Sequence, residues 1–307
     1  MPKVSVCIPT YNQIEHLRRT LESVLIQTYK NYELIITDDS TTPLVKDLTD
    51  QFDFDGRLKY YHNNIPLGSP QNWNHCISMA SGDFIKIIHH DDWFTDSNSL
   101  EEYVQYLVNN PNIDLAFSTS HVLLADGENW DHTTTDEQLD VIKTNPAILF
   151  IGNTIGGPSA IIFRNKIELR FDTKLKWLVD IDFYINNISK YKSLGYIKSA
   201  LITTFAAVGR ISDSCIDNKQ IEVFEYFYLY EKLIYEYPST DKSILNKCLG
   251  QLLTICSKYN ITKISDIRAC GFDGRIQFLF RLYMFLNRTI GSDRISHYSK
   301  KLIINLS

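Results

Sequence analysis

Four ionisable side chains follow one another at the end of an apolar run. In the segment FIKIIHHDDWF, residues 84–94, a stretch predicted as a buried strand ends in His89, His90, Asp91 and Asp92. Ionisable groups at the end of a buried strand are costly unless water, a metal or a charged ligand receives them. Carboxylate oxygens are the ligands that hard divalent cations prefer. This strand end therefore indicates a binding site.

A second pair of acids lies in the segment WLVDIDFY, where Asp180 and Asp182 are two residues apart. If a helix begins near Trp177, their side chains point about 200° away from each other, so only one carboxylate can face a given crevice. A carboxylate beside a hydroxyl can act as a general base. One of the two acids is therefore a candidate base, and the other fits a plain role in the first helical turn.

The elements that position these residues follow an α/β pattern. Over the first 120 residues, short β-rich runs alternate with helical periods, which predicts a mostly parallel sheet with flanking helices. Ligands of such sheets gather beyond the carboxyl ends of the strands. Polar clusters follow three predicted strands, at residues 10–12, 38–39 and 89–92. Because these ends converge on one edge, we expect a single site there.

The rest of the chain divides into two predicted parts. Residues 121–153 are predicted to be irregular and then helical, and 159–164 and 195–205 to be strands on either side of the helix near Trp177. From about residue 218 the apolar period is helical throughout. These patterns predict a first domain over residues 1–215 and a helical extension over residues 216–307.

Composition restricts the class of protein. Hydrophobic residues make up 44% and charged residues 22% of the 307 residues, and the formal net charge is −5, which argues against a nucleic-acid binder. The six cysteines are scattered without metal-ligand spacing, as expected for reduced thiols in the cytoplasm. No secretory signal or run of about 18 apolar residues is evident. We therefore expect a cytoplasmic protein.

Several motifs in order carry a resemblance to a known family. They are PTYNQ (9–13), QTYKNYELIITDDS (27–40), SGDFIKIIHHDDWF (81–94), GGPSAIIFR (156–164) and WLVDIDFY (177–184). Together they resemble the family 2 glycosyltransferases of the GT-A fold over roughly residues 2–215. The resemblance implies transfer of a sugar from a nucleotide donor to an acceptor hydroxyl, with inversion at the anomeric carbon.

The resemblance also implies a donor site. Pro9, Thr10, Tyr11 and Asp39 would line a uridine pocket, where the Asp39 carboxylate would accept a hydrogen bond from uracil N3–H. Asn72 falls where the family often has a polar residue near the nucleotide. The plainer alternatives are a turn aromatic for Tyr11, a helix N-cap for Asp39 and a structural helix start for Asn72.

For the diphosphate, Asp92 would ligate Mn²⁺ or Mg²⁺, and Asp91 would contact the ribose or a metal-bound water. The alternative for both is capping of the next helix. His89 stands where many relatives have another aspartate, so it would ligate the metal, hydrogen-bond the phosphate, or simply be a polar residue at the sheet edge. His90 has the same alternatives. Arg210 is the candidate for the cation that the family carries on a loop near the diphosphate.

For catalysis, Asp180 aligns with the catalytic base of the family, whereas Val179 replaces the acid that usually precedes it. This departure leaves the acceptor preference open. The glycines of residues 156–159 would allow the backbone to pass close under the acceptor.

The resemblance predicts a metal-dependent hexosyltransferase. It would move a sugar from a UDP-sugar to a saccharide in O-antigen or capsule repeat-unit synthesis on a polyprenyl diphosphate carrier. One alternative is a nucleotidyltransferase, which usually has a glycine-rich loop after the first strand that PTYNQIEHL lacks. The other is a noncatalytic sugar- or nucleotide-binding module, which would not need Asp180.

The last part of the chain has two interpretations. From Gly271 onward there are six Lys or Arg and two Asp, a net charge of +4, and the stretch 275–288 is largely apolar. This stretch fits a core helix of the extension. It also fits a helix at a membrane surface, which suits a basic tail and a lipid-linked acceptor.

Overall fold

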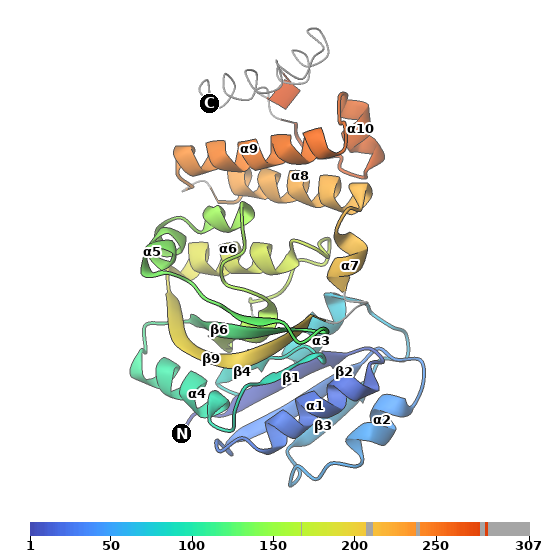
Figure 1. Ribbon diagram of the computed structural model, residues 1–307, viewed down its shortest axis with the longest axis vertical. Coiled ribbons are helices and arrows are strands. Elements are labelled where there is room, and N and C mark those ends of the chain that lie inside the picture. The colour runs from blue at the N-terminus through green and yellow to red at the C-terminus, as the bar shows by residue number, and fades with distance from the viewer. Residues whose placement is uncertain (167, 207–210, 238–239, 277–279, 282–307) are drawn as a thin grey trace.

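The computed structural model describes residues 1–166, 168–206, 211–237, 240–276 and 280–281. Its sheet lies at one end of the long axis and its C-terminal helices at the other (Figure 1). The strands are β1 (Val4–Thr10), β2 (Tyr32–Asp38), β3 (Leu58–His62), β4 (Phe84–Ile87), β5 (Asp92–Phe94), β6 (Leu115–Leu124), β7 (Asn129–His132), β8 (Ile161–Arg164) and β9 (Leu194–Ala206).

The helices of the described chain fall into those that cover the sheet and those beyond it (Figure 1). They are α1 (Ile14–Leu25), α2 (Leu44–Thr49), α3 (Gln71–Ser78), α4 (Ser99–Asn109), α5 (Asp136–Thr144), α6 (Val179–Tyr191), α7 (Ile211–Cys215), α8 (Lys219–Tyr235), α9 (Lys242–Lys258) and α10 (Ile264–Ala269), with the 3₁₀ turns η1 (Pro146–Phe150) and η2 (Pro158–Ala160).

The sheet has the order β3-β2-β1-β4-β8-β6-β9-β5, with β7 paired to β6. Neighbours from β3 to β4 are parallel, and β6 is parallel to β9. Strand β8 runs antiparallel to both β4 and β6, and β5 runs antiparallel to β9. The predicted α/β class of the GT-A type is confirmed. The antiparallel pairs follow from long-range pairing, which the local pattern does not show.

Strand β1 explains why the first strands are apolar throughout. Val4, Val6 and Ile8 belong to a core on the face covered by α1, α2 and α4, whereas Cys7 belongs to the core on the other face. Because both faces of the strand are buried, both sets of alternating side chains are apolar. The polar residues therefore begin only where the strand ends.

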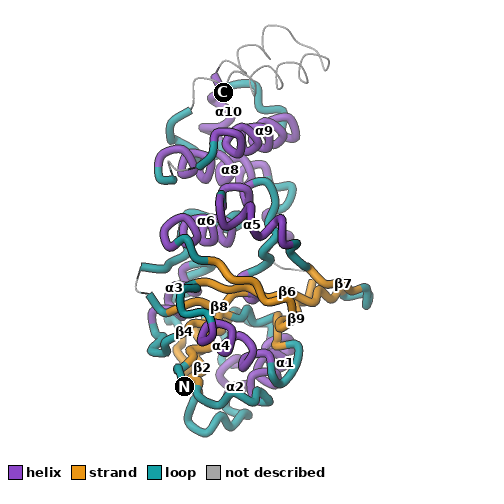
Figure 2. Tube along the Cα trace, turned by 90° about the vertical axis from the view of Figure 1, so that its left-hand side faces the viewer, coloured by secondary structure: helices purple, strands orange, loops and turns teal. Residues whose placement is uncertain are grey.

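One segment differs from the prediction. Residues 121–153 were expected to be irregular before becoming helical, but β6 continues to Leu124 and turns back into β7. Gly127 has φ of 92° in the connecting turn, a region that favours glycine. The hairpin forms an arm that projects from the sheet (Figure 2). Helix α5 then begins with a capping box of Thr135 and Gln138, so its predicted helical character is correct.

The C-terminal helices share their core with the rest of the chain. Buried side chains of α8 and α9 belong to the same hydrophobic cluster as those of α6 and η1. The rings of Phe150 and Tyr226, for example, pack edge to face with centroids 5.3 Å apart. The boundary at residue 215 stays a prediction. In the described part of the chain, no helix has both the length and the apolar character needed to cross a bilayer. Most of the stretch 275–288 lies outside the described residues.

Candidate active site

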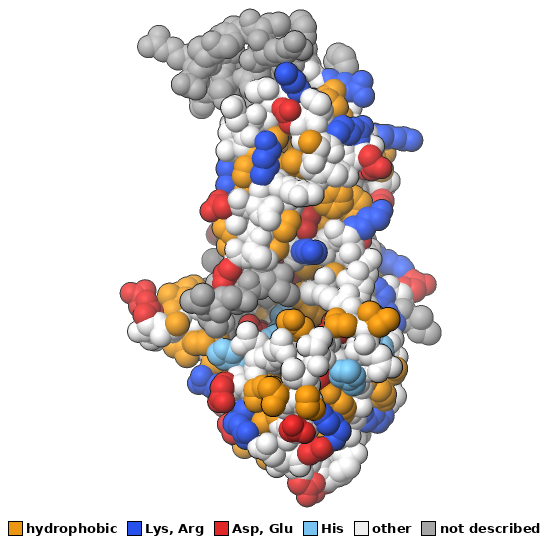
Figure 3. All heavy atoms as spheres, turned by 90° about the vertical axis from the view of Figure 1, so that its right-hand side faces the viewer, with side chains coloured by type: hydrophobic (Ala, Val, Ile, Leu, Met, Phe, Trp, Pro, Cys, Tyr) orange, Lys and Arg blue, Asp and Glu red, His pale blue; other side chains and the backbone are white. Residues whose placement is uncertain are grey.

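A cavity of about 430 Å³ lies beyond the carboxyl ends of β1 and β4. Its walls include the start of α1, the loop before η2, the first turn of α6 and residues of β6 and β9. On this face of the molecule, histidine and hydrophobic side chains gather between the helices above and the sheet below (Figure 3). Of the three strand ends predicted to converge, those of β1 and β4 line this cavity, whereas residues 38–39 after β2 do not.

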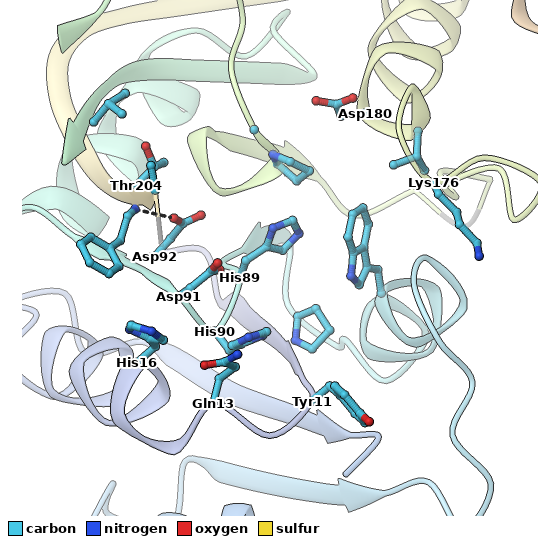
Figure 4. A pocket seen from close by; sticks show the side chains of 18 of the residues that line it. Tyr11, Gln13, His16, His89, His90, Asp91, Asp92, Lys176, Asp180 and Thr204 are labelled. Carbon is cyan, nitrogen blue, oxygen red and sulfur yellow. Dashed lines mark hydrogen bonds between the residues drawn. The ribbon is translucent and has the colours of Figure 1, made fainter. Parts of the chain in front are cut away.

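The turn between β4 and β5 brings three of the predicted residues together. One donor atom each of His89, Asp91 and Asp92 lies within 4.8 Å of the other two. The turn is closed by the Asp92 N–H, which donates to the His89 carbonyl at 3.0 Å. The Phe205 N–H of β9 donates to Asp92 Oδ1 at 3.3 Å, which fixes that carboxylate against the sheet. Figure 4 shows the three side chains at the cavity wall.

The electrostatics of this cluster fit a divalent cation. Burial, together with the charge of the neighbouring Asp91 carboxylate, raises the pKa of Asp92 to about 8. A bound cation would offset that cost of ionisation. Burial also lowers the pKa of His89 to about 4, so its imidazole is neutral near pH 7. Its Nε2 is buried and has no hydrogen-bond partner among the described residues. A neutral imidazole and two carboxylates can ligate a divalent cation.

Lys86 is a buried lysine beside this cluster, and the sequence did not point to it. Its Nζ donates to the backbone carbonyls of Ser159 and Ile161, the latter at 3.3 Å, and lies 4.6 Å from the centre of the Tyr103 ring. Burial lowers its pKa, whereas the charge of Asp92 opposes that effect. The available signal was one lysine within an apolar run. Lys86 ties β4 to η2, which lines the cavity.

Asp180 lies in the first turn of α6 and lines the same cavity, across from the acidic cluster (Figure 4). Its Oδ2 accepts a hydrogen bond from Asn153 Nδ2 at 2.9 Å, and its Oδ1 accepts from the Ile181 N–H at 2.8 Å. Burial raises its pKa to about 7. A carboxylate with such a pKa is suited to accept a proton near neutral pH.

Asp182 points away from the cavity, so the two acids diverge as their spacing predicts. It forms a buried ion pair with Lys232 of α8, with Asp182 Oδ1 and Lys232 Nζ 2.6 Å apart. The same Nζ lies 3.0 Å from Asp172 Oδ2. Asp182 therefore joins α6 to the C-terminal helices.

Glu225 of α8 holds the segment that leads into α6. Its buried carboxylate accepts hydrogen bonds from the backbone N–H groups of Lys176, Trp177 and Leu178, at 2.7, 2.9 and 2.8 Å. Lys176 and Trp177 line the cavity, and Asp180 follows directly. No local pattern indicates this role, because Glu225 lies 47–49 residues from its partners.

Some of the residues predicted to bind the nucleotide line the cavity, and the others do not. Pro9 and Tyr11 line the cavity, and the Tyr11 side chain is 54% exposed. Thr10 is buried, and its Oγ1 has no hydrogen-bond partner within the described residues. Asn12 and Gln13 follow with φ of 54° and 56°, a region rarely adopted by residues other than glycine. This tight turn places Tyr11 at the cavity mouth.

Asp39 and Asn72 lie behind the cavity wall and do not line it. Asp39 Oδ1 accepts from Asn63 Nδ2 at 2.7 Å and from the Leu67 N–H at 3.1 Å, and Oδ2 accepts from the Gly68 N–H at 2.8 Å. Asn63 also donates to Asn72 Oδ1 at 3.0 Å, which joins the two predicted residues in one network.

Asn72 itself holds two strand ends together. Its Nδ2 donates to the carbonyls of Thr10 and Thr37 at 3.3 and 3.0 Å, at the ends of β1 and β2. The N-cap of α2 is Pro43, so the alternative role of Asp39 as a helix N-cap is wrong. Arg210, the predicted diphosphate residue, lies outside the described residues.

The fold is of the GT-A class, and its cavity places the acids at the end of β4 across from the Asp180 carboxylate on α6. The model of the family described as glycosyl transferase family 2 matches residues 5–171. The chain therefore belongs to family 2 and is a glycosyltransferase.

Two bacterial relatives are similar over most of their length. A Haemophilus influenzae protein named an uncharacterized glycosyltransferase is 25% identical over 239 residues, which cover 76% of this chain and 90% of that protein. The Escherichia coli K12 protein WcaA, provisionally named a colanic acid biosynthesis glycosyl transferase, is 26% identical over 293 residues. These cover 89% of this chain and 99% of WcaA.

Solved structures share the fold. S. aureus TarS 1-349 in complex with UDP-GlcNAc has a TM-score of 0.66 at 16% identity, covering 99% of this chain and 88% of that one. The mannosyltransferase PcManGT from Pyrobaculum calidifontis, in complex with GDP-Man and Mn²⁺, has a TM-score of 0.57 at 14% identity. The match covers 99% of this chain and 85% of that one.

Proposed function

We propose that this glycosyltransferase transfers a sugar from a UDP-sugar to a hydroxyl of a saccharide acceptor, with inversion at the anomeric carbon. The observation that carries the proposal is that one cavity holds both a candidate cation site and a candidate general base. The cluster of His89, Asp91 and Asp92 can receive a cation and a diphosphate, and Asp180 stands across from it. Direct displacement needs a base on the side of the sugar opposite the leaving group.

His89, Asp91 and Asp92 would hold the Mn²⁺ or Mg²⁺, which supplies positive charge where the diphosphate accumulates negative charge. Asp180, oriented by Asn153, would take the proton of the acceptor hydroxyl at Oδ2. The hydroxyl oxygen then forms its bond to the anomeric carbon. The bond from that carbon to the diphosphate breaks, and its electron pair leaves with the diphosphate.

A uridine donor is supported by the TarS complex with UDP-GlcNAc. The Asp39 carboxylate is buried and accepts hydrogen bonds from Asn63, Leu67 and Gly68, so in this structure it holds the segment 63–68 and does not face the cavity. Tyr11 would stack on the base. Since PcManGT holds GDP-Man on the same fold, the base must be tested directly.

Calorimetry with UDP, CDP and GDP, each with and without Mn²⁺, tests the donor assignment. We expect UDP to bind most tightly and Mn²⁺ to strengthen its binding. Equal affinities for the three nucleotides would remove the uridine assignment.

For the pathway, we propose synthesis of a surface-polysaccharide repeat unit, of the O-antigen or capsule type, on a polyprenyl diphosphate carrier. The name of WcaA supports a polysaccharide product. A lipid-linked acceptor would place the enzyme at the inner face of the cell membrane as a peripheral protein. Transfer of radiolabelled sugar into a butanol-extractable lipid fraction would test the carrier, and label found only in water-soluble product would contradict it.

A further inference from the structure

A row of side chains crosses four strands and runs from the cation cluster to the projecting arm. Asp92 of β5 is opposite Thr204 of β9, Thr204 is opposite Val122 of β6, and Val122 is opposite Trp130 of β7. Side chains of directly opposed residues point to the same face of a sheet. Asp92, Thr204 and Val122 all line the cavity. Trp130 therefore extends the cavity-lining face by one strand.

Trp130 is unusual for its position. Its side chain is 49% exposed, although an indole normally gains free energy from burial. It stands on the arm that projects from the sheet (Figure 2). At about 4.8 Å between neighbouring strands, its backbone lies about 14 Å from that of Asp92. This distance is longer than one sugar residue, so the indole can reach a unit of the acceptor other than the one that reacts.

We propose that Trp130 is a stacking platform for a neutral pyranose ring of the saccharide acceptor. The apolar C–H face of a pyranose packs against an indole face, and the indole N–H can donate to a ring hydroxyl. This inference rests on the proposed glycosyltransferase function and adds to it a subsite for the acceptor.

The charge of the arm favours a neutral ligand. Asp126, Glu128 and Asp131 are exposed on the arm, and Asp131 lies 2.8 Å from His121 Nδ1 on the opposite face of the hairpin from Trp130. An anionic sugar or an anionic lipid surface would be repelled by these carboxylates. The same acids argue against insertion of Trp130 into a membrane.

Fluorine NMR of protein labelled with 5-fluorotryptophan tests this subsite directly. The chain has four tryptophans, and the spectrum of Trp130→Phe assigns the resonance of Trp130. The probes are methyl pyranosides of glucose, galactose, mannose and N-acetylglucosamine up to 200 mM, the methyl glycoside of glucuronic acid, and vesicles with 30% phosphatidylglycerol.

We expect at least one neutral pyranoside to shift the Trp130 resonance, whereas the glucuronide and the vesicles leave it unchanged. If no neutral pyranoside moves the resonance, the stacking proposal is wrong. If only the vesicles or only the glucuronide move it, the surface binds a membrane or an anion, and the proposal is also wrong.

Kinetics provide the second readout. The acceptor is an oligosaccharide built from the sugar that shifts the Trp130 resonance. We expect Trp130→Ala to raise the acceptor KM roughly tenfold, and Trp130→Phe to restore most of the affinity. The affinity for UDP and the rate of donor hydrolysis should stay unchanged. Asn129→Ala, an exposed residue of the same strand on the other face, is the matched control. An unchanged KM in Trp130→Ala would overturn the subsite.

The two proposals fail in different ways. If UDP does not bind in the presence of Mn²⁺, the donor assignment fails, whatever the Trp130 resonance does. If UDP binds and the donor is hydrolysed but no neutral pyranoside moves Trp130, the proposed function stands and the subsite falls.

Discussion

Burial of the Asp180 carboxyl in the cavity wall brings its pKa to about 7, so small changes in its contacts alter the fraction of ionised base. If Asp180 accepts the proton, turnover rises about tenfold per pH unit below pH 7 and levels off above it. Asn153 donates to the ionised form, and its removal raises the pKa further. We therefore expect Asn153→Ala to move the inflection of the pH–rate profile to higher pH.

The stability of the fold gives an independent check on this pKa. In the unfolded chain Asp180 loses its proton near pH 4, whereas in the folded protein it keeps the proton to about pH 7. The free energy of unfolding should therefore fall as pH rises through this window, and Asp180→Asn should reduce that fall. Urea denaturation of the wild type and of Asp180→Asn from pH 4 to 8 measures this dependence of the free energy of unfolding on pH. An identical pH dependence in the variant would contradict the raised pKa.

Asp92 is predicted to matter for cation binding more than for folding. A ligand that binds only the folded state raises its melting temperature by mass action. We expect Mn²⁺ to raise the melting temperature of the wild type and to leave that of Asp92→Ala unchanged, with Mn²⁺-stimulated turnover lost. Asp131→Ala, on the exposed arm, is the control and should respond like the wild type. A variant that remains active in EDTA would show that the metal role is wrong.

Among single residues, the sequence could predict those whose role depends on the local pattern. His89 to Asp92 stand out because an apolar strand ends abruptly, and Asp180 and Asp182 separate because helix geometry turns them apart. Asn153 and Lys86 could not be assigned from sequence, since their partners lie 27 and 73–75 residues away. Those contacts exist only once β8, η2 and α6 have packed.

Helix α8 bears on the site although none of its residues lines the cavity. Glu225 accepts three backbone N–H groups of the segment that leads into α6, and Lys232 pairs with Asp182 on α6. The Leu178 N–H is buried, and a buried amide without an acceptor would cost about 1–3 kcal/mol. The helix therefore fixes the position of Asp180 from outside the α/β layer.

Replacing Glu225 with Gln tests this role. Gln keeps one carbonyl oxygen, but its amide nitrogen is a donor facing donors, so at least one backbone N–H loses its acceptor. We expect the free energy of unfolding to fall by about 1–3 kcal/mol and turnover to drop while the affinity for UDP is kept. Glu236→Gln, exposed at the end of the same helix, is the control. Equal turnover in both variants would contradict a positioning role.

The hairpin arm shows what element prediction lacks. Strand β7 reads Asn-Trp-Asp-His and is mostly exposed, so a single apolar residue, Trp130, gives no alternation that would mark the strand. It exists because each residue pairs with β6, a partner that a local pattern cannot supply. The strands β1, β2 and β4 were predictable because both of their faces are buried, which makes them apolar throughout.

At the scale of the whole molecule, the sheet layer and the C-terminal helices meet through one apolar core and two buried acid contacts. Buried residues of α6, α8 and α9 belong to one cluster. A chain that ends at residue 215 would expose this surface and lose both Glu225 and Lys232. The predicted division into 1–215 and 216–307 therefore needs a direct test.

We expect the fragment of residues 1–215 to lose cooperative thermal unfolding and to aggregate, because the apolar face of α6 would be left exposed. Circular dichroism and size-exclusion chromatography measure both properties, with the full chain as the control. A monomeric fragment that unfolds cooperatively and binds UDP as tightly as the full chain would establish the extension as a separate domain.

The role of Asp180 as the base is tested most directly by the single-turnover rate of Asp180→Asn with a saturating UDP-sugar donor, UDP-GlcNAc being the first of a panel. Asn keeps the size of the side chain and removes the proton acceptor, so the rate should fall by about 10² to 10⁴ while UDP affinity stays nearly unchanged. Asp182→Asn should keep most of its activity, since Asp182 faces Lys232 rather than the cavity. An active Asp180→Asn beside an inactive Asp182→Asn would contradict the assignment of the base.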